Sequence, residues 1–123
     1  MEHSDLQYKM AIIIRGDVEM SFGKSISQAC HACLESSEQS KKKDLQGWKA
    51  WRSEGSGKIV LEARNFDEFK NLEARTIKLG LPHARIQDRG LTEVKPGTIT
   101  ALGIGPAAAK LVDKVIGSLP LLK

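Results

Sequence analysis

The sequence predicts an α/β fold: a single domain with a mixed four-stranded sheet and helices on both faces. Strand-like and helix-like segments follow the order β-α-α-β-α-β-β-α, which is typical of an α/β layer fold. Two helical crossovers favour parallel neighbouring strands, whereas the short loop between the last two strands indicates that one of them runs antiparallel. The 123 residues suit one modest core, which we assign to residues 9–123, with residues 1–8 as a flexible N-terminus.

The first strand and the first helix organise the rest of the chain. Met10–Ile14 is a continuous apolar run rich in β-branched residues, which is typical of a strand buried on both faces. After a polar turn, helical periodicity predicts a helix over Lys24–Gln39. The charged segment Ser40–Asp44 breaks that pattern and is predicted to be a solvated loop, with contact to phosphate groups as the alternative.

The helix over Lys24–Gln39 has two chemically different sides at about 100° per residue. The side that we expect to be buried carries Ile26, Ala29, Cys30, Cys33 and Leu34. The opposite side carries Lys24, Gln28, His31 and Glu35. On periodicity alone, the polar side is the solvated face of an amphipathic helix. Because it lies just beyond the carboxyl end of a strand, where open α/β sheets bind ligands, it is also a candidate binding stripe.

Caps, turns and alternating patterns predict the remaining elements. Asp44 is the predicted N-cap of a short helix that buries Trp48 and Trp51 as core anchors. Asn65 caps the next helix, and Gly80 ends it. The other predicted elements are strands at residues 58–64, 84–87 and 98–104, a helix from Pro106 to Gly117, and an apolar tail over residues 119–123 that needs a surface to pack on.

The composition indicates a cytoplasmic protein and is compatible with a polyanionic partner. A net charge of +4 and a pI of about 9.2 permit nucleic-acid binding without requiring it. No apolar run approaches the roughly 20 residues of a membrane span, and the acidic, polar start is unlike a signal peptide. We therefore expect no membrane association. Two cysteines in such a chain are expected to be reduced and, in mid-helix, buried and inert.

Three apparent motifs fail on inspection. Gly23-Lys24-Ser25 imitates the end of a phosphate-binding loop, but Val18 occupies the position of the required earlier glycine. Gly103–Ala108 imitates a dinucleotide fingerprint without the later strand and acidic residue. The two cysteines have no second pair of ligands for a zinc ion. No serine lies in a nucleophile elbow, so water would be the nucleophile of any hydrolase.

Four segments carry a more specific signal. They are Ile14-Arg15-Gly16-Asp17 with Gly23-Lys24 and Gln28-Ala29-Cys30-His31-Ala32; Leu79-Gly80-Leu81-Pro82; Asp88-Arg89-Gly90-Leu91-Thr92-Glu93 with Pro96-Gly97-Thr98 and Thr100; and Gly105-Pro106 with Asp113 to Leu122. In this order, the segments resemble the type 2 peptidyl-tRNA hydrolase family. One segment would carry little weight, but four in register span nearly the whole chain from Met10.

The resemblance implies a fold and a function. The family fold is a mixed four-stranded sheet flanked by helices, commonly as a homodimer. Its members hydrolyse the ester that joins a peptide to the 3′ end of tRNA, which releases the tRNA for reuse. No metal or other cofactor is implied. The chemistry requires a water aimed at the ester carbonyl, a group that takes its proton, and positive charge near the developing oxyanion.

The resemblance also implies the site residues. The catalytic candidates are Lys24, Asp88, Thr92 and Thr98, with Gln28 and His31 orienting their neighbours. Asp88 would orient or deprotonate the water, and Lys24 would stabilise the oxyanion or hold Asp88. The two threonines would hydrogen-bond the water or the terminal ribose. The weaker candidates for contact with tRNA phosphates are Arg15, Lys41, Lys42 and Lys43.

Without the resemblance, a structural role is the preferred interpretation of each of these residues, and other functions stay open. Asp88 also suits a turn in which it caps its own backbone, and Thr98 suits a strand by propensity. A non-catalytic module that binds RNA or protein on the same fold is the main alternative function, and a small nucleotide-binding domain is a third. Lys24 and Asp88 favour the enzyme, because a pure binding module needs no acid–base pair. The failed glycine motifs argue against the nucleotide-binding domain.

Overall fold

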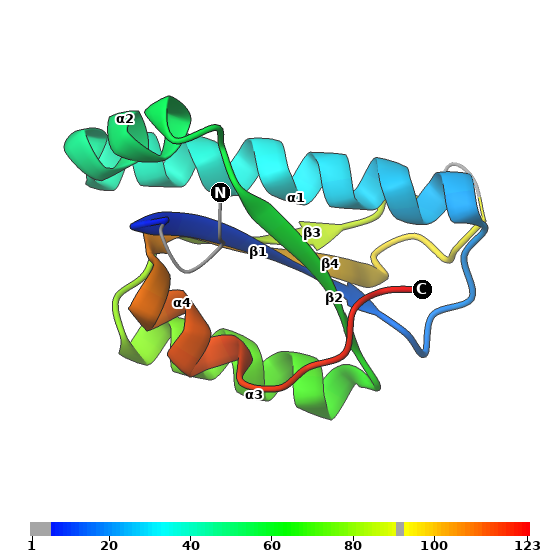
Figure 1. Cartoon of the computed structure of the whole chain (residues 1–123). Coiled ribbons are helices and arrows are strands. Elements are labelled where there is room, and N and C mark those ends of the chain that lie inside the picture. The colour runs from blue at the N-terminus through cyan, green and yellow to red at the C-terminus, as the bar shows by residue number, and fades with distance from the viewer. Residues whose placement is uncertain (1–5, 91–92) are drawn as a thin grey trace.

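The computed structural model describes residues 6–90 and 93–123 (Figure 1). It confirms the predicted α/β class and the predicted order of elements. The strands are β1 (Tyr8–Arg15), β2 (Lys58–Ala63), β3 (His83–Gln87) and β4 (Ile99–Ala108). The helices are α1 (Phe22–Lys43), α2 (Leu45–Ser53), α3 (Phe66–Lys78) and α4 (Ala109–Ile116).

The N-terminal boundary differs from the prediction. Of the predicted flexible segment 1–8, residues 1–5 lie outside the described residues, but Tyr8 already belongs to β1. The backbone N–H groups of Gln7 and Tyr8 both donate to the carboxylate of Glu54, each at 3.1 Å. The strand therefore begins earlier than the apolar run, because a side chain from the end of α2 fixes its first residues.

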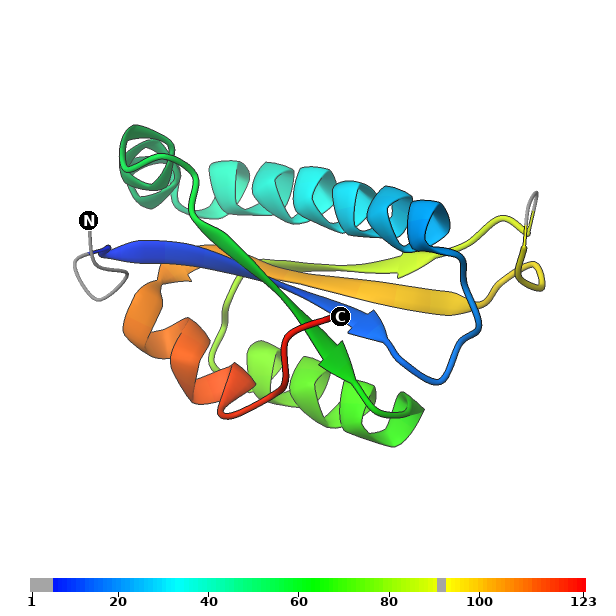
Figure 2. The ribbon, with the colours of Figure 1, turned by 45° about the vertical axis from the view of Figure 1, so that its right-hand side comes forward.

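The sheet is mixed, with the strand order β2-β1-β4-β3. β1 and β2 pair in parallel, whereas β4 is antiparallel to both of its neighbours. β4 is therefore the antiparallel strand that the short β3–β4 connection indicated. Helices α1 and α2 cover one face of the sheet, and α3 and α4 cover the other (Figures 1 and 2).

β1 is a central strand with an apolar core on each side, as its sequence predicted. Ala11 and Ile13 belong to the cluster that includes residues of α3 and α4. Met10, Ile12 and Ile14 belong to the cluster on the α1 and α2 side. Because successive side chains of a strand point to opposite faces, one apolar run supplies both cores.

Helix α1 is longer than predicted. The segment Ser40–Asp44, predicted to be a loop, contains the last turn of α1, which continues to Lys43. Ser40 is 1% exposed and its hydroxyl donates to the carbonyl of Pro106 at 2.8 Å. Positive charge is favourable at a helix C-terminus, so Lys41–Lys43 stabilise the last turn rather than ending the helix.

The face of α1 that packs on the sheet was wrongly predicted. Its buried residues are Gln28, Ala32, Ser36 and Ser40. Ile26 and Leu34, which we expected to be buried, are 50% and 59% exposed. The reason is a close approach between helix and strand, since a Cβ atom on Gly103 of β4 would lie 2.5 Å from the carbonyl oxygen of Ala32. Only small or slender side chains fit between them.

Predictions for four side chains on this face of the sheet had different outcomes. The cysteines are not buried as predicted, because Cys30 is exposed and Cys33 is half-buried. Trp51 is a core residue, 3% exposed, as expected. Trp48 is only partly buried, and its indole N–H donates to the hydroxyl of Ser37 at 2.9 Å.

The C-terminal part of the chain also corrects the prediction. The last helix does not begin at Pro106, because β4 continues to Ala108 and α4 starts at Ala109. The extension pairs with the start of β1, with Tyr8 opposite Ala108. These backbone bonds keep the segment extended, although glycine and proline were expected to end the strand.

The apolar tail packs where the sheet would otherwise end. Leu121 forms a bridge with Leu61 of β2, and the backbone N–H of Leu122 donates to the carbonyl of Val60 at 3.1 Å. The backbone N–H of Glu62 in turn donates to the carbonyl of Pro120 at 2.9 Å. The tail thus covers the exposed edge of β2, which limits unwanted pairing with other chains.

Candidate active site

The candidate site lies at the carboxyl ends of β1 and β3. Lys24 stands in the first turn of α1, which follows β1, and Asp88 directly follows β3. The Nζ atom of Lys24 donates to Oδ1 of Asp88 at 2.5 Å, and the two side chains are only 10% and 6% exposed. The fold therefore brings together two candidates that are far apart in the sequence. A nearly buried ion pair at this edge of a sheet is a candidate for function.

Asp88 is held at both carboxylate oxygens. The backbone N–H of Gly90 donates to Oδ2 at 2.5 Å. The hydrogen bond from Lys24 is the largest cause that lowers the pKa of Asp88, and the bond from Gly90 adds to it, whereas burial acts in the opposite direction. Asp88 is therefore a carboxylate at neutral pH, with a fixed orientation.

Gln28 connects Asp88 to a residue that sequence reasoning missed, Thr100. The Nε2 atom of Gln28 lies 3.4 Å from Oδ1 of Asp88, and Thr100 donates its hydroxyl to Oε1 of Gln28 at 2.5 Å. Gln28 is 3% exposed and Thr100 is fully buried. Because a hydroxyl donates to the amide oxygen, the amide NH₂ group must face Asp88. The family motif contains this threonine, but only Thr98 was assigned a role.

A cleft of about 660 Å³ opens beside these residues. Its lining includes Lys24, Gln28, His31, Glu35, Asp88 and Arg89. The polar side of α1 that the sequence singled out thus faces a cleft. His31 lies one turn beyond Gln28, and its positive charge, when present, also lowers the pKa of Asp88.

The other predicted residues add no side-chain hydrogen bond to this cluster or lie outside the described residues, although the carbonyl of Thr98 accepts from the backbone N–H of Asp88 at 2.8 Å. Thr98 donates its hydroxyl to the carbonyl of Lys95 at 2.7 Å, and Thr92 lies outside the described residues. Arg15 pairs with Asp17 at 2.7 Å and also donates to the carbonyl of Ile99. Lys41–Lys43 lie at the opposite end of α1 from Lys24.

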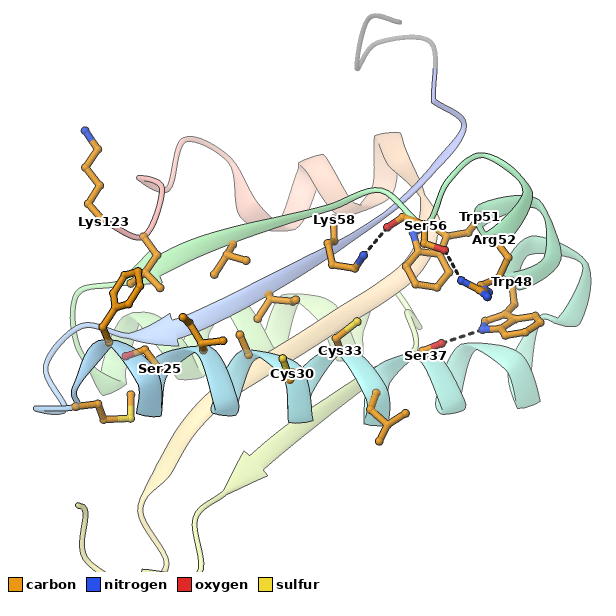
Figure 3. A pocket seen from close by; sticks show the side chains of 18 residues that line it. Ser25, Cys30, Cys33, Ser37, Trp48, Trp51, Arg52, Ser56, Lys58 and Lys123 are labelled. Atoms are coloured by element: carbon orange, nitrogen blue, oxygen red, sulfur yellow. Dashed lines mark hydrogen bonds between the residues drawn. The ribbon is translucent and has the colours of Figure 1, made fainter. Parts of the chain in front are cut away.

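A larger groove, of about 980 Å³, lies on the other side of α1 (Figure 3). It is lined by the apolar side of α1 together with residues of α2, β2 and the C-terminal tail. Ile26 and Leu34 line it, and so do Cys30 and Cys33. None of the candidate catalytic residues that the structure describes lines this groove, so we separate it from the chemistry.

Two further features bear on the site and its setting. Within residues 6–90 and 93–123, no group of three or more histidine, cysteine, aspartate or glutamate side chains is arranged to hold a metal ion. Over the same residues, no helix has the length and apolar character needed to cross a membrane.

The fold and the site define a small α/β protein with a lysine–aspartate pair beside a cleft at the carboxyl edge of its sheet. The chain belongs to the PTH2 family of peptidyl-tRNA hydrolases, because the family model described as "Peptidyl-tRNA hydrolase PTH2" matches residues 8–122. This confirms the resemblance found in the four sequence segments.

Individual relatives agree with this assignment. The chain is 44% identical over 116 residues to the peptidyl-tRNA hydrolase of Thermococcus onnurineus, covering 94% of this chain and 98% of that protein. It is 45% identical over 120 residues to the peptidyl-tRNA hydrolase of Pyrobaculum aerophilum, covering 96% and 100%. Among solved structures, a protein of unknown function from Agrobacterium tumefaciens matches 95% of this chain and 98% of its own, with a TM-score of 0.56 and 13% identity. That similarity shows the fold alone.

Proposed function

We propose that this chain hydrolyses the ester bond between peptide and tRNA in peptidyl-tRNA, releasing free tRNA. The single observation that carries the proposal is the Lys24–Asp88 ion pair, at 2.5 Å, beside an open cleft. Family membership supplies the substrate class. We further propose that residues 9–123 form one catalytic domain that acts in the cytoplasm, where translation supplies peptidyl-tRNA, without a metal or other cofactor.

The two charged groups suit different tasks. An effective general base has a pKa near the working pH, but Lys24 and Gly90 keep the pKa of Asp88 below its ordinary value. Asp88 is therefore better suited to orienting the attacking water, and to stabilising the positive charge that develops on that water, than to holding the proton that the water loses. Lys24 places a cation beside the cleft, where it would stabilise the oxyanion of the tetrahedral intermediate.

The remaining candidates support this pair. Gln28 aims its amide at Asp88, and His31 lies on the same side of α1 in the wall of the cleft. Thr92 and Thr98 are proposed to hydrogen-bond the water or the terminal ribose. Arg15 and Lys41–Lys43 are proposed to contact tRNA phosphates, since such contacts supply most of the sequence-independent affinity for nucleic acids.

Release of peptide from purified peptidyl-tRNA tests the proposed function. The wild-type chain is expected to cleave the ester, and addition of a chelator is expected to leave the rate unchanged. A folded wild-type protein that binds the tRNA without cleaving it would instead support the alternative, a non-catalytic binding module on the same fold.

Replacing Thr100 with valine is expected to lower kcat about 10-fold. Valine has a similar shape but cannot donate to Oε1 of Gln28, so the amide loses the contact that aims its NH₂ group at Asp88. The buried amide oxygen is left without a partner, which costs about 1–3 kcal/mol of stability. Cleavage kinetics and thermal unfolding measure the two effects. Thr100→Ser keeps the hydroxyl and serves as the control, and equal kcat values for the serine and valine variants would contradict this role.

The apolar groove supports the expectation of a homodimer, which we retain as a proposal. Phe22, Ile26 and Leu34 of α1 are 80%, 50% and 59% exposed along it, and Leu121 of the neighbouring tail is 55% exposed. Contiguous exposed apolar side chains usually mark an interaction surface. A second copy of the chain offers the same surface, so two copies related by a twofold axis could cover both.

The double variant Ile26→Glu/Leu34→Glu is expected to be monomeric and folded. Both side chains are about half exposed, so the charges would oppose association without disturbing the core. Light scattering after size-exclusion chromatography measures the mass of each variant. Ile77→Glu is the matched control, because Ile77 is 58% exposed but belongs to α3 on the opposite face of the sheet. A wild-type protein that stays monomeric at high concentration would contradict the proposed dimer.

A further inference from the structure

The loop between β3 and β4 makes a second contact with the start of α1, in addition to the Lys24–Asp88 pair. Glu93 of this loop accepts two hydrogen bonds from Ser21, the N-cap of α1. The backbone N–H of Ser21 donates to Oε1 at 2.6 Å, and its hydroxyl donates to Oε2 at 2.5 Å. In Figure 1, the parts of this loop drawn in yellow lie near the N-terminal end of α1, in blue. Ser21 thus donates to both carboxylate oxygens of a residue from a distant part of the chain.

The charge of Glu93 suits this position. The first turn of α1 contains no acidic residue, although negative charge is favourable at a helix N-terminus. Glu93 supplies that charge from another segment. The hydrogen bonds from Ser21 lower the pKa of Glu93, so the group is a carboxylate at neutral pH.

Ser21 also transmits the contact toward the site. Its hydroxyl oxygen accepts a hydrogen bond from the backbone N–H of Lys24 at 3.1 Å. Ser21 precedes Lys24 by three residues, and Glu93 follows Asp88 by five. Among the described residues, the same two segments are therefore joined by the candidate catalytic pair and again by Ser21 and Glu93.

The second contact is better suited to alignment than to stability. Glu93 is exposed, and exposed polar contacts contribute little to the free energy of unfolding. Small misplacements of catalytic groups, however, cause large losses of rate, about 10²-fold for 1 Å. A contact that fixes the distance between two catalytic segments can thus matter for rate while it hardly changes stability.

We propose that Glu93 is a positioning residue for peptidyl-tRNA hydrolysis: through Ser21 it holds the loop that follows Asp88 against the start of α1, and so keeps Asp88 aligned with Lys24. This inference rests on the proposed function and on the proposed catalytic pair. Glu93 acts through Ser21 rather than on the substrate, so its loss lowers kcat and leaves KM nearly unchanged.

The test compares Glu93→Ala with Glu93→Gln. The alanine variant is expected to lower kcat about 10-fold, within the range expected for a sub-ångström misplacement, with little change in KM or in the melting temperature. Glutamine offers an oxygen to the N–H of Ser21 and an N–H to its hydroxyl, so it is expected to restore most of kcat. Glu19→Ala, at an exposed glutamate two residues before Ser21, is the control and is expected to keep the wild-type rate.

A double-mutant cycle with Ser21→Ala tests whether the two residues act as one contact. Ser21→Ala removes the hydroxyl bond to Glu93 but keeps the backbone N–H bond. The double variant Ser21→Ala/Glu93→Ala is therefore expected to lose less than the two single losses combined, because the bond from the hydroxyl is absent in both single variants. Three results would each overturn the inference. They are additive losses in the double variant, a rise in KM without a fall in kcat, and a loss of kcat that parallels a loss of melting temperature. A wild-type protein that fails to cleave overturns the proposed function, whereas normal cleavage by Glu93→Ala overturns only the role of Glu93.

Discussion

Replacing Asp88 with asparagine is expected to lower kcat for peptidyl-tRNA cleavage by roughly 10³-fold, within the range for loss of a group that assists proton transfer. Asparagine has the same shape but no charge. Its NH₂ group would face Lys24 or the backbone N–H of Gly90, and both of these are donors. The water would lose its acceptor, and the ammonium of Lys24 would lose its counter-ion. Single-turnover release of peptide measures the effect on the chemical step.

The control for Asp88→Asn is the same substitution at Asp67, whose side chain is 90% exposed in the first turn of α3. Asp67→Asn is expected to cleave at the wild-type rate. Because the side chain of Lys24 is only 10% exposed, leaving its ammonium without a counter-ion also lowers stability. Thermal unfolding of each variant must therefore accompany the kinetics. A folded Asp88→Asn variant that cleaves nearly as fast as wild type would show that Asp88 does not orient the attacking water.

Local signals in the sequence were sufficient for most of the fold. The apolar run of β1, the cap by Asp44 and the cap by Asn65 each depend on residues within a few positions. The structure contains both caps, with Asp44 accepting from the N–H of Gly47 at 3.1 Å and Asn65 from that of Glu68 at 2.9 Å. The order of elements followed from such signals, and the topology then followed from general rules for connecting strands.

The buried face of α1 could not be predicted in this way. Hydrophobic periodicity identifies the apolar side of a helix, but not the distance to the sheet on which the helix packs. Here Gly103 lets the backbone of β4 approach Ala32 so closely that only small or slender side chains fit. The apolar side of α1 is left to line the external groove, where Ile26 and Leu34 remain about half exposed.

The candidate site was predicted in part, because the family motifs contain its residues but not their geometry. Thr98 and Thr100 are two positions apart, and simple strand alternation would point both side chains to one face. The pairing of β3 with β4 shifts register between Ile86 and Gln87, which stand opposite Ala101 and Ile99. Such an irregularity re-aims side chains. Only the structure shows that the hydroxyl of Thr100, rather than that of Thr98, reaches Gln28.

Replacing Lys24 with methionine is expected to lower kcat by about 10²–10³-fold, the usual effect of removing one group that stabilises an oxyanion. Methionine keeps much of the length of the side chain, so the cleft should retain its shape. Lys110→Met, at an exposed position in α4, is the matched control and is expected to have no effect on kcat.

Lys24→Met should also move the acidic limb of the pH–rate profile. Lys24 is the largest cause that lowers the pKa of Asp88 from 3.8, whereas burial raises it. Without the ammonium, burial becomes the largest remaining cause, although the hydrogen bond from Gly90 still opposes it, so Asp88 takes up a proton at a higher pH than in the wild type. In the wild-type protein, the stability that the depressed pKa provides is fully present above pH 3.8 and is lost as the pH falls through the lower folded value. In the variant this stabilisation is reduced, so both the residual activity and the acid stability should fall at a higher pH than in the wild type. Rates and unfolding measured across the acidic range test both shifts together. Suppose that kcat falls strongly but that neither the acidic limb of the pH–rate profile nor the pH of acid unfolding moves. Lys24 would then act on the oxyanion alone and would not hold Asp88 in its charged form.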